Sequence, residues 1–198
     1  MSKLGIYGGT FNPVHLGHVH LLRQVKELAG LDRILIMPDR VPPHKEAPDL
    51  ASSEDRLAMV KLAFDGIDGI EVSELELKRE GRSYTYLTIR DLKALYPDAE
   101  LFLIMGADML LTFDKWVNYE EILRNATLIA AAREDGEYAA LLEKAKALGN
   151  ARILPTRPLP MSSTDVRLAA KAGSDLSGMV PESVGRYIAE HDLYRKGD

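Results

Sequence analysis

The sequence predicts an α/β fold, a Rossmann-like parallel sheet with helices on both faces, and three observations support this prediction. Short apolar runs alternate with amphipathic helical patterns along the 198 residues. The first run, Leu4–Tyr7, is followed at once by Gly8 and Gly9 and then by a helical pattern, as in folds that bind nucleotide phosphates. Neither a repeat nor a low-complexity tract interrupts this order, so one domain over residues 1–198 is expected.

Each predicted strand is short, apolar and bounded by turn residues or helical patterns. The six runs are Leu4–Tyr7, Arg33–Met37, Ile70–Val72, Leu101–Met105, Thr127–Ala132 and Ala151–Leu154. Because strands alternate with helices, right-handed crossovers and parallel pairing are expected. Ligands bind such sheets at the carboxyl ends of the strands, so residues 8–18, 38–45 and 106–108 should share one edge.

The first helix is expected from about His18 to Ala29, with Gly30 as its stop signal. Its apolar face would combine Leu21, Leu22, Val25, Leu28 and Ala29.

The second helix begins at Ser52 or Ser53, because Ser52 and Asp55 have the spacing of a capping box. It should bury Leu57, Val60 and either Leu62 or Phe64. Further helices are predicted over Thr85–Leu95, Met109–Phe113, Tyr119–Arg124, Tyr138–Leu148, Thr164–Ala172 and Glu182–Glu190.

The composition excludes several classes of function. A net charge of −5 gives no reason to expect nucleic acid as a partner. The absence of cysteine excludes disulfides, thiolate catalysis and cysteine-based zinc sites. No signal peptide and no apolar run of membrane-spanning length is visible, so we expect a cytoplasmic protein with no membrane partner.

The segment GGTFNPVHLGH, residues 8–18, is the most informative in the chain. Its glycines let the backbone approach a ligand closely. His15 and His18 are three residues apart and are expected on one face of the helix that begins there, which Gly17 keeps open. Backbone N–H groups and the helix dipole favour an anion at a helix N-terminus, so a nucleotide phosphate is predicted at this one, which carries two imidazoles. Half of a metal site, or surface histidines without a role, is the alternative.

A second segment with hydroxyl side chains opens a late helix at Ser162, Ser163 and Thr164. These residues can simply cap the helix. They can also donate to phosphate oxygens, with the guanidinium of Arg167 one turn later.

Two cations follow predicted strands. Lys45 ends the proline-rich loop 38–48, where it can reach a phosphate or remain an ordinary exposed lysine, while His44 is expected only to shape the loop. Arg133 follows the fifth strand and is a weaker candidate for the adenine or ribose side, because two acidic residues come directly after it.

Three further positions admit a structural or a functional role. Ser83 or Thr85 is a candidate N-cap. Asp108 follows the fourth strand and can accept from a ribose hydroxyl or cap a helix. Trp116, the only tryptophan, can pack in the core or stack on a flat ligand ring.

Four motifs together, GGTFNPVHLGH, PPHK, GAD and SSTDVR, resemble the His-x-Gly-His nucleotidyltransferase superfamily, which includes class I aminoacyl-tRNA synthetases. The whole chain looks most like the bacterial nicotinate mononucleotide adenylyltransferases. The resemblance implies the nucleotidyltransferase fold and the reaction of ATP with nicotinate mononucleotide to give deamido-NAD and pyrophosphate. It implies small-molecule substrates, with Mg²⁺ carried by the ATP phosphates.

The resemblance also implies roles for individual residues. The catalytic group would be His15, His18 and Lys45. The ATP and phosphate group would be Gly8, Gly9, Thr10, Phe11, Gly106, Asp108, Arg133, Ser162, Ser163, Thr164 and Arg167. The nicotinate nucleotide group would be Tyr84, Thr85 and Trp116. The chain departs from the family pattern at Arg82 and Glu134, where the family has proline.

Other readings stay open at this point. A related adenylyltransferase would act on nicotinamide mononucleotide or on another phosphorylated acceptor. A protein of another class would bind nucleotides as a sensor without catalysis. The presence of His15, His18, Lys45 and Arg167 together favours an enzyme. The oligomeric state is open as well, with a homo-oligomer as one alternative.

Overall fold

The computed structural model describes residues 1–40, 49–81, 83–132 and 138–195. Within these ranges, six strands form one parallel sheet in the order β3-β2-β1-β4-β5-β6. The strands are β1 (Lys3–Gly9), β2 (Arg33–Pro38), β3 (Ile70–Val72), β4 (Glu100–Gly106), β5 (Ala126–Ala132) and β6 (Ala151–Pro155). The predicted parallel sheet and all of its predicted strands are therefore confirmed.

The helical segments alternate with these strands as expected. They are α1 (Leu16–Ala29), α2 (Ser53–Phe64), α3 (Leu75–Lys78), α4 (Thr85–Leu95), α5 (Ala107–Leu111), the 3-10 turn η1 (Phe113–Lys115), α6 (Tyr119–Asn125), α7 (Tyr138–Leu148), α8 (Ser163–Lys171) and α9 (Glu182–Glu190). None of the helices in the described ranges has the length and apolar character needed to span a bilayer.

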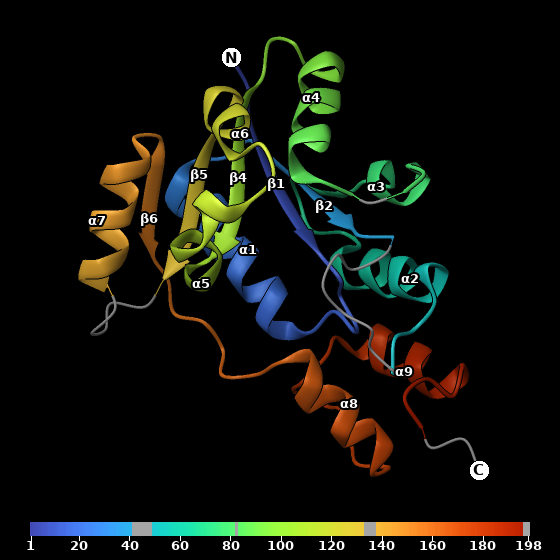
Figure 1. Ribbon diagram of the computed structural model, residues 1–198. Helices are drawn as coiled ribbons and strands as arrows, with labels where there is room; N and C mark the ends of the chain where they lie inside the picture. The colour runs from blue at the N-terminus through green and yellow to red at the C-terminus, as the bar shows by residue number, and fades with distance from the viewer. Residues whose placement is uncertain (41–48, 82, 133–137, 196–198) are drawn as a thin grey trace.

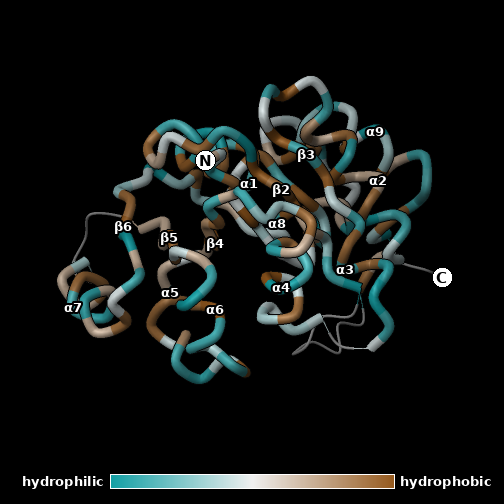
Figure 2. The backbone as a smooth tube through the Cα atoms, turned by 90° about the horizontal axis from the view of Figure 1, so that it is seen from above, coloured by the Kyte–Doolittle hydropathy of each residue, from teal (hydrophilic) through white to brown (hydrophobic). Residues whose placement is uncertain are grey.

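Alternate residues of each strand point to opposite faces of the sheet, and each face has its own core. Ile34 and Ile36 of β2 pack into a core formed with α1, α2, α8 and α9. Leu35 and Met37 of the same strand pack into a second core formed with α4, α5, α6 and α7. Figure 2 shows α4 to α7 on one side of the strands and α1, α2 and α9 on the other. The prediction of helices on both faces is confirmed.

The central strands bring the predicted site segments to one edge. In Figure 1, β1 runs from the N-terminus at the top of the picture down toward α8. The order of strands reverses between β1 and β4, which is where ligands bind in open α/β sheets. Gly9 at the end of β1 pairs with Pro38 of β2, and Gly106 ends β4 on the other side. The shared edge is thus confirmed for the parts that the structure describes.

Some predicted helical faces are wrong. In α1 the buried stripe is Val19, Leu22 and Val25, while Leu28 is 51 % exposed in the last turn before Gly30. The apolar face of α1 therefore lies nearer its N-terminus than the prediction placed it. Gly30 itself is confirmed as the stop, because it adopts the left-handed conformation with φ of 60°.

In α2 the cap is confirmed, since the Ser52 side chain accepts from the backbone N–H of Asp55. The buried face is turned relative to the prediction. Val60 and Phe64 are buried as expected, but Leu57 is half-buried and Leu62 is exposed. Their places on the buried face are taken by other residues, namely Arg56, Met59 and Ala63.

The helix predicted over Met109–Phe113 is wrong in its bounds. The chain forms α5 up to Leu111 and then the tighter turn η1. Leu110 and Phe113 are both fully buried, and they lie three residues apart. A 3-10 turn aligns residues at that spacing, so the change of helix type keeps both side chains in the core.

Candidate active site

The turn between β1 and α1 folds back on itself, and Gly9 gives it the space to do so. Phe11 has a positive φ of 50°, and its ring folds back over Gly9. A Cβ at Gly9 would lie 3.0 Å from the Phe11 ring, so a side chain there would displace the ring. The hydroxyl of Thr10 donates to Asp39 at 2.9 Å. The hydroxyl proton of Thr10 is therefore engaged within the protein.

His15 and His18 lie together, but not in the predicted way. His15 is the N-cap of α1 with extended backbone, so it precedes the helix instead of sharing its face. The two ring centroids are nevertheless 3.7 Å apart. The backbone N–H of His15 donates to Nδ1 of His18 at 3.2 Å. A neutral His18 then has its proton on Nε2, where it can donate to a ligand.

Gly17 is required by the close approach of His15. A Cβ at position 17 would lie 2.9 Å from Nδ1 and Cε1 of the His15 ring. The backbone N–H of Gly17 donates to the Met161 sulfur at 3.2 Å, and this contact connects the start of α1 to the segment before α8. The expectation that Gly17 keeps room for the histidines is confirmed, with the His15 ring as the group that needs the room.

Both imidazoles are neutral at physiological pH. Burial lowers the pKa of His15 to about 4, and the nearby carboxylate of Asp165 opposes this only in part. Burial lowers the pKa of His18 to about 3, and the neighbouring His15 lowers it further. Among the described residues, Nδ1 of His15 is buried without a hydrogen-bond partner. Buried polar atoms without partners are uncommon, so this nitrogen has an unused capacity for a hydrogen bond.

The start of α8 docks against the turn after β1. Ser163 donates its hydroxyl to the Pro13 carbonyl at 2.8 Å, and Arg167 donates to the Asn12 carbonyl at 2.8 Å. Arg167 also donates to the Thr164 hydroxyl at 3.2 Å. The two predicted phosphate segments, which are about 150 residues apart in sequence, therefore meet at one place.

Capping explains Ser162, as the structural alternative predicted. Ser162 is the N-cap of α8 and forms a capping box with Asp165. Ser163 and Thr164 are free of this capping role, and each has the contact described above.

The structure has a buried ion pair next to this turn, between Arg56 and Asp39, which the sequence did not predict. Arg56 of α2 is 1 % exposed and lies 3.0 Å from the carboxylate of Asp39, the residue after β2. Its guanidinium also donates to the carbonyl groups of Thr10 and Asp39 at 2.7 and 2.8 Å. Arg56 therefore joins the glycine turn, the end of β2 and the start of α2. The signal was the spacing of Arg56, Val60 and Ala63, which share one face of the helix.

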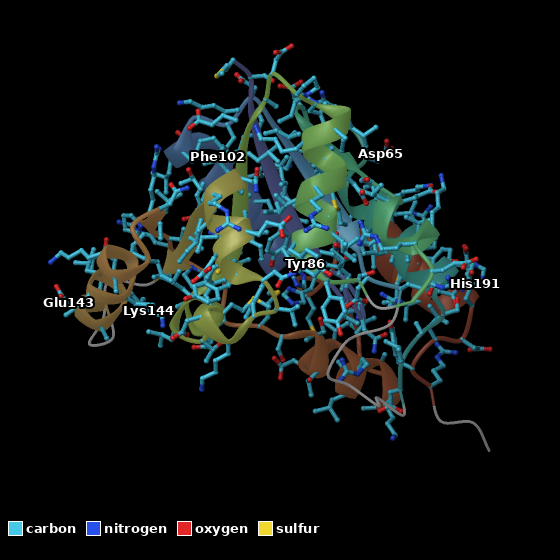
Figure 3. All side chains as sticks on the ribbon, turned by 45° about the horizontal axis from the view of Figure 1, so that its top comes forward. Asp65, Tyr86, Phe102, Glu143, Lys144 and His191 are labelled. Carbon is cyan, nitrogen blue, oxygen red and sulfur yellow. The ribbon has the colours of Figure 1, made fainter. Side chains whose placement is uncertain are left out.

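The start of α4 reaches the same edge of the sheet. The expected N-cap at Ser83 or Thr85 is wrong, because Tyr84 is the N-cap and its side chain makes no capping bond. Ser83 instead donates to the Glu76 carbonyl at 3.5 Å. Thr85 begins the helix and is half-buried. The Tyr84 ring stacks at 6.0 Å on that of Tyr86, which is labelled in Figure 3.

Trp116 lies at the same edge as Thr85. The helix α4 leads into the amino end of β4, and α6 leads into the amino end of β5. Each helix therefore begins at the opposite, carboxyl edge of the sheet. Arg90 of α4 donates to both carboxylate oxygens of Glu121 in α6, which keeps the two helices side by side. Trp116 comes just before α6 and is half-buried, with its ring 5.2 Å from that of the buried Phe113. Trp116 therefore packs against the core, as the structural alternative predicted, and is only partly buried.

Gly106 and Asp108 stand at the end of β4, next to the end of β1. Gly106 is the N-cap of α5, so the capping alternative for Asp108 is wrong. Asp108 lies in the first turn of α5 and is exposed at the sheet edge.

Other candidates lie outside the described residues. These are Lys45 and His44 in the loop after β2, and Arg133 after β5. Among the described residues, no three His, Asp or Glu side chains are grouped so as to hold a metal ion. Two carboxylates beside the turn, those of Asp39 and Asp165, are engaged by Arg56 and Ser162.

Comparison with known proteins agrees with this geometry. The family model described as cytidylyltransferase-like matches residues 6–169. A protein of Symbiobacterium thermophilum named "Probable nicotinate-nucleotide adenylyltransferase" is 39 % identical and covers 100 % of this chain and 98 % of its own. A protein of the same name from Neisseria meningitidis is 36 % identical and covers 99 % of this chain and 100 % of its own.

The fold also matches solved structures. The nicotinic acid mononucleotide adenylyltransferase of Plasmodium falciparum complexed with NaAD superposes with a TM-score of 0.81 at 20 % identity, covering 98 % of both chains. At that identity the likeness concerns the fold. The chain therefore belongs to the cytidylyltransferase-like family and, within it, to the nicotinate-nucleotide adenylyltransferases.

Proposed function

We propose that the protein transfers the adenylyl group of ATP to nicotinate mononucleotide, giving deamido-NAD and pyrophosphate. One observation above all supports this reaction. The starts of α1 and α8 converge on the turn after β1, where His15, His18 and Arg167 lie at the edge of the sheet that binds ligands. Two helix N-termini and a guanidinium suit a polyphosphate better than any uncharged ligand.

The chemistry needs no protein nucleophile or base. An oxygen of the mononucleotide phosphate, already an anion, attacks the α-phosphorus of ATP. A new oxygen–phosphorus bond forms while the bond to the leaving pyrophosphate breaks. The protein contributes by placing the two reactants in line and by stabilising the negative charge that accumulates.

In this proposal His18 donates its Nε2–H to the transferred phosphate, and His15 lies against the same group. A buried neutral imidazole is already oriented, so it loses little freedom when the transition state forms. Arg167 and Lys45 neutralise the phosphates of ATP. The backbone N–H groups of residues 8–11 complete the phosphate site, and Asp108 accepts from a ribose hydroxyl.

Mg²⁺ fits this site as an ion that arrives with ATP. The described residues offer no carboxylate cage, and the carboxylates of Asp39 and Asp165 are already in an ion pair and in hydrogen bonds. Mg²⁺ is commonly bound through substrate phosphates together with water. When bound, it would neutralise charge on the triphosphate. We place the reaction in the cytoplasm, where ATP is abundant.

We propose that Thr85 and Trp116 bind the pyridine ring of the acceptor. The indole offers a flat surface for stacking, and the start of α4 offers a hydroxyl and backbone N–H groups to a carboxylate. A carboxylate accepts from two donors, whereas the NH2 of an amide would face one of them. This arrangement favours nicotinate over nicotinamide mononucleotide.

The test is to incubate the protein with ATP, Mg²⁺ and nicotinate mononucleotide, follow pyrophosphate release and identify the dinucleotide by mass. We expect release that depends on both the acceptor and Mg²⁺. Turnover only with another phosphorylated acceptor would replace the proposed substrate. ATP binding without turnover on any acceptor would identify a nucleotide sensor and refute the proposed reaction.

A further inference from the structure

Asn12 lies in the turn between β1 and α1, and the proposed reaction assigns no role to its side chain. It is 6 % exposed, although it is a polar residue in a connecting segment. Its Nδ2 donates to the Asp49 carbonyl at 2.9 Å, and its Oδ1 accepts from the Ala51 backbone N–H at 3.0 Å. A carbonyl can only accept and a backbone N–H can only donate, so these two contacts define which way the amide faces.

The remaining contact of Asn12 comes from the far end of the chain. Oδ1 lies 2.8 Å from the hydroxyl of Tyr194, 182 positions away in sequence. Because Oδ1 can only accept, the tyrosine must donate. Burial raises the pKa of Tyr194, which keeps this hydroxyl protonated. The amide of Asn12 is then held from three sides.

The backbone of Asn12 is part of the phosphate site itself. Its carbonyl accepts from Arg167, and the next carbonyl, of Pro13, accepts from Ser163. His15 is the third residue after Asn12. A shift of Asn12 would therefore move both the histidine pair and the contact that holds the start of α8.

The tail that presents Tyr194 has a specific and costly conformation. It follows α9, whose end is marked by His191 in Figure 3. Asp192 and Tyr194 both have positive φ, at 51° and 63°, which non-glycine residues adopt rarely. Leu193 donates to the Ile188 carbonyl at 3.0 Å and packs with Tyr194 against the core on the α1 side. Such strain persists only where surrounding contacts compensate for it.

We propose that Tyr194 is a positioning residue for the adenylyl transfer, acting through Asn12 on the turn that places His15 and Arg167. The inference rests on the proposed function. It assigns a role in the chemistry to a tail residue that touches neither substrate. The hydroxyl matters because it completes the fixation of the Asn12 amide, and the ring alone cannot do so.

The test compares Tyr194→Phe with Tyr187→Phe. Both variants lose one phenol hydroxyl from a half-buried tyrosine of the C-terminal region, but the Tyr187 hydroxyl donates to Asp55 of α2 at 3.0 Å and not to Asn12. Each variant is assayed with ATP and nicotinate mononucleotide at a temperature where melting curves show it to be folded. We expect Tyr194→Phe to lower kcat about five- to tenfold, the size of one lost hydrogen bond, with both KM values within about twofold. Tyr187→Phe should leave kcat within about twofold.

A double-mutant cycle asks whether the effect passes through Asn12. In an Asn12→Ala background, Tyr194→Phe should have no further effect on kcat, since its partner is already gone. Equal kcat for the two tyrosine variants, or an undiminished effect in the Asn12→Ala background, would overturn the inference. An unmodified protein that forms no dinucleotide would instead overturn the proposed function, and the two failures are thereby distinguished.

Discussion

Replacing Arg56 with methionine should be among the most destabilising single changes in this protein. Its side chain is 1 % exposed and that of its partner Asp39 is 11 % exposed. Methionine fills much of the space but leaves the Asp39 carboxylate without a counter-charge. It also leaves the Thr10 and Asp39 carbonyls without their donors. Breaking a buried ion pair on one side costs about 3 to 5 kcal/mol, so we expect that loss in the free energy of unfolding.

The assay is urea unfolding of matched variants. Arg186→Met removes an exposed i,i+4 pair with Glu182, whose side chains are 66 % and 90 % exposed, and should cost about 0.5 kcal/mol or less. Asp39→Asn removes the counter-charge of Arg56, but its amide oxygen can still accept from the guanidinium and its NH2 can donate to the Thr10 hydroxyl, so it should cost about 1 to 2 kcal/mol. The Arg56→Met/Asp39→Asn double variant should be more stable than the sum of the single effects predicts, by at least about 1.5 kcal/mol. A loss below about 1 kcal/mol for Arg56→Met, or strict additivity, would refute the reasoning.

Three further predictions follow from the site. His18→Ala should lower kcat by about 100- to 1000-fold, whereas His20→Ala, two residues along the same helix, should stay near the unmodified rate; equal rates for the two would remove His18 from the mechanism. Trp116→Ala should raise the KM for the pyridine nucleotide about tenfold through loss of stacking, with the KM for ATP within about twofold; equal changes would make the tryptophan purely structural. Because burial lowers the pKa values of His15 and His18 to about 4 and about 3, the unfolded chain takes up protons below about pH 6.5 that the folded protein refuses. The free energy of unfolding is then full above that pH and is lower by about 2 kcal/mol per imidazole at pH 5. Urea unfolding of His18→Asn between pH 7 and pH 5 should show a smaller loss of stability than that of the unmodified protein. Carboxylates contribute equally to the two proteins, so the difference between them reports on His18.

Patterns that depend on local sequence predicted the fold well. The strands are apolar runs in a strict alternation with helices, so the sheet, its parallel pairing and the shared edge all follow from the order of segments. The helices over Thr85–Leu95, Tyr138–Leu148 and Glu182–Glu190 have the predicted bounds because proline, glycine or the end of an apolar stripe limits them. The four-residue α3 is too short to show a helical period.

What the sequence could not predict depends on contacts between distant segments. His15 has an extended backbone and is the N-cap of α1, with its ring close to Gly17, an arrangement that the three-residue spacing of the histidines does not reveal. Arg56 shares a helix face with Val60 and Ala63, which indicates burial, but only the fold brings Asp39 to it. Tyr194 has no local pattern that links it to Asn12. Motif residues were therefore recognisable from the sequence, and the residues that hold them in place were not.

The most direct test of the proposed function is a competition assay with ATP and Mg²⁺ in which nicotinate and nicotinamide mononucleotide are present together at equal concentration. The ratio of the two dinucleotide products, resolved by mass, equals the ratio of the two kcat/KM values. We predict a ratio of at least about 100 in favour of the acid, because a carboxylate matches the donors at the start of α4 and an amide leaves one of them unpaired. A ratio near one, or a preference for the amide, would contradict the account.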